Sequence, residues 1–444
     1  MVFIGIVLIA IFLYIRDYKI PALLLFFFFI TSGFNLIPEE ITEFAFISKG
    51  SDYAFMILVG IVVIDSIYIR GYFNRDNFTK YLIVFASFLI ICIIYNKFVL
   101  KLGWSDILRT CRYQFFWIVY FLFRHLPKEK LQTLLKCLFF TSLFTAILFL
   151  LQIFIDEHIL IEGAKLSVKL FGIKIPRFYN QPDMLFFFTF MALYNNPLKG
   201  FPKYLSMFIF TAAILGAFHR SLIGGFFISV FIGYVIRLPR LKRIYILTTC
   251  SILIGIATIF IGYKFINSRT FIDLKTVLSG EISMDMEIDM DDLQNSTFTF
   301  RMLHLFERNQ YIMENPKAMF LGAGLMPEDS KIVEKMFDFK TGLSEGLTDR
   351  VIQLDTSDIS HSVLLLRFGY LGTVLYLLLF VYLTVFFYKK RSNDYGFFSF
   401  LFLTLAFSNS FFSGILINPV TFILPLISYN IIKKMDFEKV NTLN

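Results

Sequence analysis

Charged side chains are scarce in this 444-residue chain, where Asp, Glu, Lys and Arg make up only 17% of the residues. An average soluble protein has about 25%. Cysteine is scarce too, and the four cysteines form neither a CxxC pair nor a Cys/His cluster. We therefore expect neither a structural disulfide nor a zinc site.

Hydrophobic residues, by contrast, reach 57% and gather in long runs. A bilayer core of about 30 Å needs roughly 20 apolar residues in a helix, and the lack of water there demands helices. We therefore predict an all-α polytopic membrane protein with about 12–13 transmembrane helices. The predicted spans are 2–15, 20–37, 55–69, 81–100, 114–123, 137–155, 183–194, 205–218, 222–236, 244–263, 362–388, 395–408 and 411–432, the last kinked or split at Asn418-Pro419. The first run lacks the features of a cleaved signal peptide, so we interpret it as a span.

One segment differs from the rest in its charge. Residues 265–360 contain 17 acidic and 9 basic residues, whereas the chain as a whole has a net charge of +9. We predict three parts: helices 1–10 in residues 1–264, a large loop at 265–360 with short helices, and C-terminal helices at 361–444. An acidic run at 285–292 lacks the glycine and closing glutamate of a calcium loop, and we interpret it as solvated.

The basic residues predict the orientation. They occur in short runs between the spans, which fits the positive-inside rule better than nucleic-acid binding. The runs 237–243 and 389–391 flank the two spans next to the loop, so the loop is expected outside. One inter-span segment, with Lys101, Arg109 and Arg112, is placed outside against the rule.

Arg220 and His219 lie at the lip of an apolar helix on the same predicted external face. Charge at such a position is costly and is typical of a functional site. The alternative is an arginine that extends to the lipid headgroups, with His219 as an interfacial neighbour.

Two residues of the loop are further candidates. Arg301 lies near the start of an amphipathic helix predicted to end before Pro316, where it either faces an anion or is solvated. His361 lies where the loop meets the next span, with Asp358 upstream, and an imidazole can take a proton from a hydroxyl. Its alternative role is that of a helix-start histidine. Gly369 and Gly372 are expected to allow close helix packing.

Several segments together resemble the bacterial O-antigen ligase and Wzy-type polysaccharide polymerase superfamily. They are Phe218-His-Arg220-Ser-Leu222, Arg301 followed by Asn315-Pro316 and Leu321-Gly-Ala-Gly324, His361-Ser362 with Arg367-Phe-Gly369-Tyr-Leu-Gly372, and Arg177 with Asn180-Gln-Pro182-Asp183. The resemblance covers about residues 170–390 and rests on the order of short motifs around one large loop.

The resemblance implies a GT-C-like glycosyltransferase of the bacterial inner membrane, with its site facing the periplasm. It implies that His361 is the general base, that Arg220, Arg301 and Arg177 bind the pyrophosphate, and that Asn180, Asp183, Asp358 and His219 support them. The substrate would be an oligosaccharide on undecaprenyl pyrophosphate, with no metal and no cofactor. A chain-length regulator and the bilayer would be partners, and nucleic acid would not.

Three functions remain open. Ser362 after His361, where ligases often have Asn, favours a polymerase that extends a lipid-linked repeat unit. An O-antigen ligase would instead transfer the polymer to lipid A core. A multi-span transporter or flippase would need ionisable groups at mid-membrane depth, for which Asp65 is the main candidate.

Overall fold

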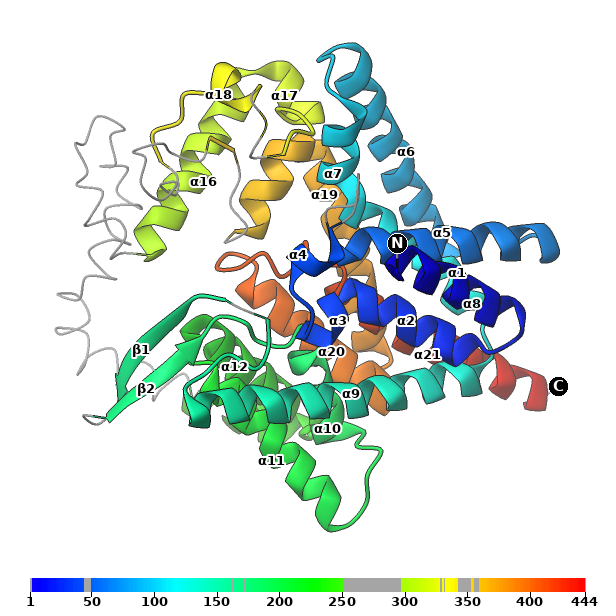
Figure 1. The fold of residues 1–444 in the computed structure, drawn as a ribbon. Helices are drawn as coiled ribbons and strands as arrows, with labels where there is room; N and C mark the ends of the chain where they lie inside the picture. Colours follow the sequence, from blue (N-terminus) through cyan, green and yellow to red (C-terminus); the bar gives the residue numbers. More distant parts are fainter. Residues whose placement is uncertain are drawn as a thin grey trace.

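A computed structural model describes residues 2–43, 49–161, 163–170, 173–246, 248–250, 297–327, 330, 332–341, 353–354 and 359–443. Within these ranges the chain is mainly helical (Figure 1). The elements are α1 (Val2–Ile15), α2 (Lys19–Ile30), α3 (Ser32–Asn35), α4 (Glu39–Thr42), α5 (Gly50–Tyr68), α6 (Asn77–Phe98), α7 (Trp104–Phe115), the 3-10 turn η1 (Phe116–Ile118), α8 (Val119–His125), α9 (Lys128–Ile155), β1 (Lys165–Leu170), β2 (Ile173–Phe178), α10 (Leu185–Tyr194), α11 (Phe201–Gly216), α12 (Arg220–Arg237), α16 (Thr297–Glu314), α17 (Pro316–Leu321), α18 (Val333–Met336), α19 (Ser360–Lys389), α20 (Asp394–Asn409) and α21 (Val420–Leu443).

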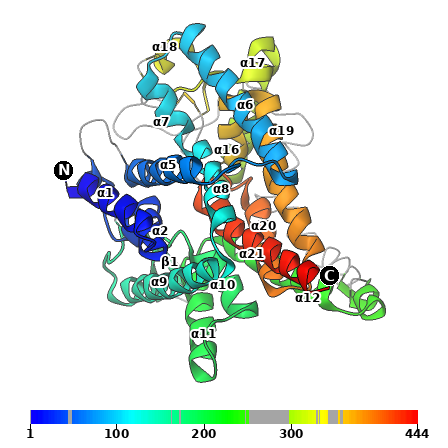
Figure 2. The same ribbon diagram turned by 90° about the vertical axis from the view of Figure 1, so that its right-hand side faces the viewer.

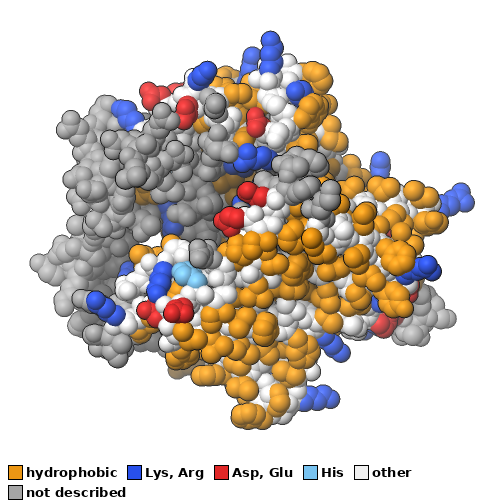
Figure 3. Space-filling model, in the orientation of Figure 1, with side chains coloured by type: hydrophobic (Ala, Val, Ile, Leu, Met, Phe, Trp, Pro, Cys, Tyr) orange, Lys and Arg blue, Asp and Glu red, His pale blue; other side chains and the backbone are white. Residues whose placement is uncertain are grey.

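Five helices in the described part of the chain are long and apolar enough to cross a membrane: α5, α6, α9, α12 and α19. The shorter apolar helices α1, α2, α10 and α11 accompany them. Figure 3 shows apolar side chains over much of one face of the molecule. The fold is consistent with a helical multi-pass membrane protein. The number of about 12–13 spans stays a prediction, and the expected span 244–263 lies mostly outside the described residues.

The predicted span at 114–123 is not a single regular helix. Its residues are divided among the end of α7, the turn η1 and the start of α8. The physical reason is that α7 is amphipathic. Its Arg112 turns inward and binds Asp52 of α5 through Nη1, at 2.9 and 3.0 Å from the two carboxylate oxygens, whereas Trp104 is exposed. This part-buried ion pair neutralises the charge of Arg112 within the protein.

The structure also contains an antiparallel hairpin of β1 and β2, which the sequence analysis did not predict. Lys165 pairs with Phe178 and Leu166 pairs with Arg177 in its register.

The predicted run at 411–432 is split, as its Asn418-Pro419 pair indicated: α20 ends at Asn409 and α21 begins at Val420. Residues 410–419 form the connection between these two helices.

Chain direction separates two ends of the helical bundle. The helices α12 and α20 are antiparallel: Gly225 near the start of α12 packs on Asn409 at the end of α20, and Arg237 at the other end is 3.6 Å from Asp394. We call the end that carries Arg220, His361 and residues 410–419 the site end. The opposite end, where Lys390 pairs with Asp436 at 2.8 Å, is here called the basic end.

The described part of the large loop packs on α19 at the site end. Gly369 has φ +64° and ψ −171°, and it kinks α19 where α17 crosses it. A Cβ on Gly369 would lie 2.5 Å from the Ala318 carbonyl oxygen, and one on Gly322 would lie 2.3 Å from the Arg367 carbonyl oxygen. On the next turn Gly372 faces Phe88 of α6, and Figure 2 shows α6 beside α19. The close packing expected of Gly369 and Gly372 is therefore confirmed.

Candidate functional site

The first turn of α19 is held by the connection between α20 and α21. The N-cap residue Ile359 offers no side-chain cap, so other groups must satisfy the amides of the first turn. The Ser360 amide donates to the carbonyls of Ser410 and Ser413, both at 3.2 Å. Its hydroxyl donates to the Ser413 carbonyl at 2.7 Å and accepts from the Leu416 amide at 3.2 Å. Residues 410–416 and the start of α19 therefore form one fixed unit.

His361, the predicted base, follows Ser360 and is half-buried. Its Nε2 lies 3.0 Å from Ser410 Oγ, and its ring lies 4.3 Å from the ring of Phe411. The single proton of the Ser410 hydroxyl is donated to the Phe407 carbonyl at 2.8 Å. The hydrogen-bond network therefore assigns the proton of neutral His361 to Nε2 and its lone pair to Nδ1. An imidazole fixed at one nitrogen can accept a proton at the other.

A cavity of about 180 Å³ lies on the other side of the α20–α21 connection. It is lined by Gln181, Pro182, Asp183, Phe186, Leu222, Phe402, Ser413, Gly414, Ile415, Asn418 and Thr421. These residues come from the segment after β2, the helices α10, α12, α20 and α21, and the connection that also holds His361. The site end therefore combines a small, partly polar cavity with a fixed histidine.

Asp183 is the acidic residue of this cavity. Its carboxylate accepts hydrogen bonds from the amide groups of Asn418, at 3.2 Å, and Asn35, at 3.5 Å. Its own backbone amide donates to Asn35 Oδ1 at 3.2 Å. Burial raises the pKa of the carboxyl to about 6, although the two amide hydrogen bonds act in the opposite direction. Asp183 can therefore change its charge close to neutral pH.

Arg220 begins α12 and is exposed at the site end. Leu222, in the same turn, lines the cavity, and Arg220 itself is not among the lining residues. The preceding His219 is the N-cap residue of the helix, and its Nδ1 lies 3.1 Å from the Ser221 hydroxyl. The glycine at position 225 brings α12 against α20, because a Cβ there would lie 2.1 Å from the Asn409 amide nitrogen. This contact sets the position of the first turn.

Arg177 and Asn180 belong to the hairpin and the segment after it. Arg177 is half-buried on β2, with its guanidinium 4.3 Å from the centre of the Tyr179 ring. The Asn180 side chain anchors this segment: its Oδ1 accepts from Gln152 of α9 at 2.7 Å, and its Nδ2 donates to the Ile161 carbonyl at 2.6 Å. Asn180 thus holds the chain that leads to Asp183.

The helix α16 carries Arg301 toward the same end. One turn after Arg301, the buried His304 accepts from the Ser362 hydroxyl at Nδ1, 3.0 Å away, and Nε2 donates to the Leu354 carbonyl at 3.2 Å. Burial, with a smaller contribution from Arg308, lowers the pKa of His304 to about 3, so the ring is neutral. Ser362 follows His361, and this contact therefore fixes α16 beside the predicted base.

Arg308 fixes the rest of the loop to α16. Its buried guanidinium binds Glu307 at 2.6 Å, the Leu354 carbonyl at 3.1 Å and the Thr341 carbonyl, and it lies 4.2 Å from the Phe339 ring centre. The sequence analysis missed His304 and Arg308. Their spacing from Arg301, three and seven residues, places all three along one side of a helix and could have indicated them.

The structure thus places the candidates as follows. His361 and Asp183 both contact the α20–α21 connection, and Arg220 begins α12 at the same end. Arg177 and Arg301 lie on the separate elements β2 and α16. Figure 1 shows β2 and α16 on the same side of the molecule, and Figure 3 shows Lys and Arg side chains at a hollow in this face. Asp358 and the acidic run 285–292 lie outside the described residues. Among the residues that are described, no group of three His, Cys, Asp or Glu side chains could hold a metal ion.

Asp65, the residue that a transporter would use, lies one turn from the end of α5. It is buried and accepts a hydrogen bond of 2.7 Å from the Tyr14 hydroxyl. This contact accounts for its burial without a transported ion. No protein-family model matches the chain, and no curated protein sequence is significantly similar to it.

Proposed function

We propose that this protein is a Wzy-type polysaccharide polymerase, a membrane glycosyltransferase that extends a lipid-linked repeat unit. The observation that carries the proposal is the setting of His361, whose Nε2 lies 3.0 Å from Ser410 Oγ and whose ring lies against Phe411; we assign the lone pair to Nδ1. A general base needs such a positioned lone pair. The proposal includes a GT-C-like fold of about 12–13 spans in a bacterial inner membrane, with the site end facing outward.

In the proposed reaction, an acceptor hydroxyl oxygen bonds to the anomeric carbon of the donor glycan. The hydroxyl proton passes to Nδ1 of His361, and the bond from the anomeric carbon to the pyrophosphate oxygen breaks. The electron pair of that bond leaves with undecaprenyl pyrophosphate. Negative charge therefore develops on the leaving pyrophosphate, and groups that stabilise this charge contribute strongly to the rate.

Arginine suits this leaving group, because a guanidinium binds phosphate oxygens through two parallel, charge-assisted hydrogen bonds. Arg220 is exposed at the start of α12, and Arg301 and Arg177 are carried to the same end by α16 and β2. We assign these three residues to pyrophosphate binding. Asp183, Asn180 and His219 hold the surrounding backbone, and Asp358 is proposed as a further support.

The test is polymerisation of a defined lipid-linked repeat unit by the purified protein in lipid nanodiscs. We expect His361→Ala to lower turnover about 100-fold to 10,000-fold, the usual contribution of a general base. His125→Ala is the matched control, because His125 lies at the basic end, with Nε2 3.0 Å from the Tyr72 carbonyl. Normal polymer from His361→Ala at equal protein level would overturn the assignment of the base.

Arg220→Lys tests the role of the guanidinium. Lysine keeps the charge but loses the bidentate contact, so we expect turnover to fall about 100-fold. Arg240→Lys is the control, since Arg240 is an exposed arginine beyond the other end of α12. Equal chain lengths from the two variants would show that Arg220 does not bind the pyrophosphate.

The same assay separates the other functions. An O-antigen ligase would transfer preformed polymer to lipid A core and would leave single repeat units unextended. A flippase would move the lipid-linked unit across the bilayer without forming a glycosidic bond. Either result, with the expected polymerisation absent, would refute the polymerase proposal.

A further inference from the structure

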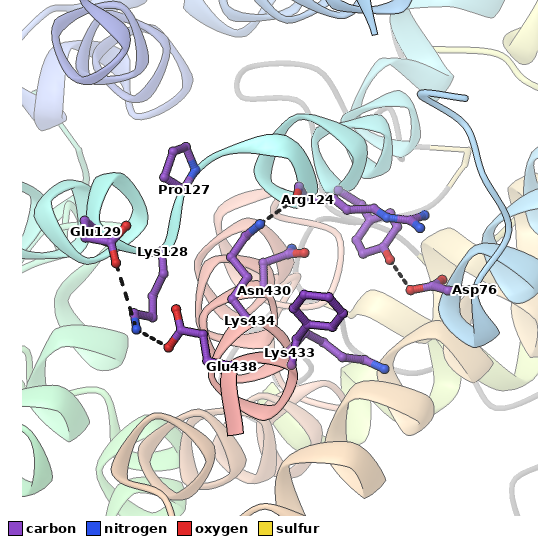
Figure 4. A pocket seen from close by; sticks show the side chains of 11 residues that line it. Asp76, Arg124, Pro127, Lys128, Glu129, Asn430, Lys433, Lys434 and Glu438 are labelled. Carbon is purple, nitrogen blue, oxygen red and sulfur yellow. Dashed lines mark hydrogen bonds and ion pairs between the residues drawn. The ribbon is translucent and has the colours of Figure 1, made fainter. Parts of the chain in front are cut away.

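A second cavity lies at the basic end, opposite the site end that carries the candidate site. It has a volume of about 470 Å³ and lies between α8, the start of α9, the N-cap of α6 and the last turns of α21 (Figure 4). Its lining includes the basic residues Arg124, Lys128, Lys433 and Lys434. None of the functions proposed for the site end uses this cavity.

The carboxylates of the cavity are engaged within the protein. Asp76 caps α6 through the Thr79 amide at 2.8 Å and also accepts from the Tyr120 hydroxyl at 2.5 Å. Glu438 binds Lys128, which lies 3.9 Å from Glu129 as well. Figure 4 shows these contacts as dashed lines. Glu129 and Glu438 therefore both lie against Lys128, and Asp76 is held by Tyr120 and Thr79.

The other three cations contact neutral groups. Arg124 Nη1 donates to the Asn74 carbonyl at 2.5 Å, and Lys434 Nζ donates to the Arg124 carbonyl at 3.0 Å. Lys433 Nζ lies 5.8 Å from the ring centre of Tyr429 and 6.0 Å from that of Phe386. Figure 4 shows that these side chains reach the cavity from α8 and from the last turns of α21. With Lys128, the lining therefore holds four basic residues against three acidic ones, Asp76, Glu129 and Glu438, a net charge of +1.

The surface next to this cavity is apolar. A groove of about 400 Å³ lies between α6 and α19, and its lining includes Leu378, Val381, Val385 and Phe386. Phe386 is also one of the two rings beneath Lys433, so the groove adjoins the basic cavity. A cationic cavity joined to an apolar groove along two helices matches a phospholipid, which has an anionic head and apolar chains.

We propose that the cavity at the basic end binds a phosphate group, with Arg124, Lys433 and Lys434 around it. The guanidinium and the two ammonium groups supply charge-assisted hydrogen bonds, and Asn430 adds a neutral donor. The phosphate belongs either to the headgroup of an anionic phospholipid, whose chains lie in the groove, or to a free phosphate compound. The proposal is independent of the chemistry at the site end.

The experiment uses the full chain and two probes. Native mass spectrometry measures retention of phosphatidylglycerol and of phosphatidylcholine, and thermal unfolding in phosphatidylcholine nanodiscs measures stabilisation by pyrophosphate. The test variant is Lys433→Gln with Lys434→Gln, which keeps most of each side-chain stem. The control is Lys136→Gln with Lys242→Gln, two exposed lysines outside the cavity that remove the same charge.

We expect the test variant to bind phosphatidylglycerol at least about tenfold more weakly than the wild type, a loss of about 1.4 kcal/mol. Saturable stabilisation by pyrophosphate that this variant loses would instead identify a free phosphate as the ligand, and it also supports the site. Lys433→Gln alone removes only a contact to ring faces and serves as the second variant should the double variant fold poorly. We expect it to show a smaller loss of phosphatidylglycerol binding than the double variant. Equal binding by the test and control variants, or no preference for either anion in the wild type, would overturn the proposal.

Discussion

Replacing Gly369 by alanine should detach the described part of the large loop from α19. The backbone at this glycine has φ +64° and ψ −171°, a conformation that L-residues adopt only under strain of about 1–3 kcal/mol. The added Cβ would also lie 2.5 Å from the carbonyl oxygen of Ala318 and 2.6 Å from that of Met319. Both are backbone atoms of α17, so the clash cannot be relieved by a side-chain rotation.

The two costs combine to a substantial loss of stability. Forcing an extra carbon into a filled contact costs about 1–3 kcal/mol, so the total is about 2–6 kcal/mol. In a domain of 150–250 residues each kcal/mol lowers the unfolding midpoint by roughly 2–4 °C. We therefore expect Gly369→Ala to lower the midpoint by at least about 4 °C. We also expect lower turnover, because the same kink fixes α16 and α17 near His361.

The measurement is thermal unfolding of purified protein in nanodiscs. Gly224→Ala is the matched control, since Gly224 lies in α12 with open space where its Cβ would be. Alanine there should be neutral or slightly stabilising, as in any exposed helix interior. If Gly369→Ala unfolds at the same temperature as Gly224→Ala, then the kink and its backbone contacts do not hold the loop in place, and the reasoning fails.

Two further predictions concern pH. His304 has a folded pKa of about 3 against an ordinary value of about 6.5, so the free energy of unfolding should fall as the pH drops below 6.5, by about 2 kcal/mol at pH 5. Urea unfolding of His304→Gln should lack this pH dependence. The same pH dependence in both proteins would refute the prediction. For Asp183, whose folded pKa is raised to about 6, the charged form is disfavoured, so the stability of the wild type relative to Asp183→Asn should fall by about 2 kcal/mol between pH 4 and pH 7. A constant difference across that range would contradict the burial of the carboxylate.

Hydrophobic runs predicted the long helices well, because a helix in lipid must be apolar along its whole length. The runs at 81–100, 137–155 and 362–388 correspond to α6, α9 and α19, each extended by the polar residues that begin it. The run at 114–123 is divided among α7, the turn η1 and α8, and the residues of α8 from Val119 to Phe123 are buried within the protein.

Local pattern also failed where tertiary contacts decide the conformation. The hairpin at 165–178 has no turn motif strong enough to predict it, and it is held to α9 by the side chain of Asn180. Likewise, no feature of the sequence places Ser410 beside His361, because 48 residues and two helices separate them. The two residues are neighbours only because the fold brings the start of α19 against the end of α20.

The large loop is best understood through its contacts with α19. Two of them are independent: Gly322 and Gly369 allow backbone to approach backbone, and Ser362 binds His304. Both act on α19 itself, within nine residues of His361. Within the loop, Arg308 ties residues 341 and 354 to α16. A change at the glycine contact should therefore alter the setting of the histidine, and a change at His361 should leave the glycine contact intact. Unfolding temperature and turnover measured on Gly369→Ala and His361→Ala distinguish these cases, since only the glycine variant should affect both.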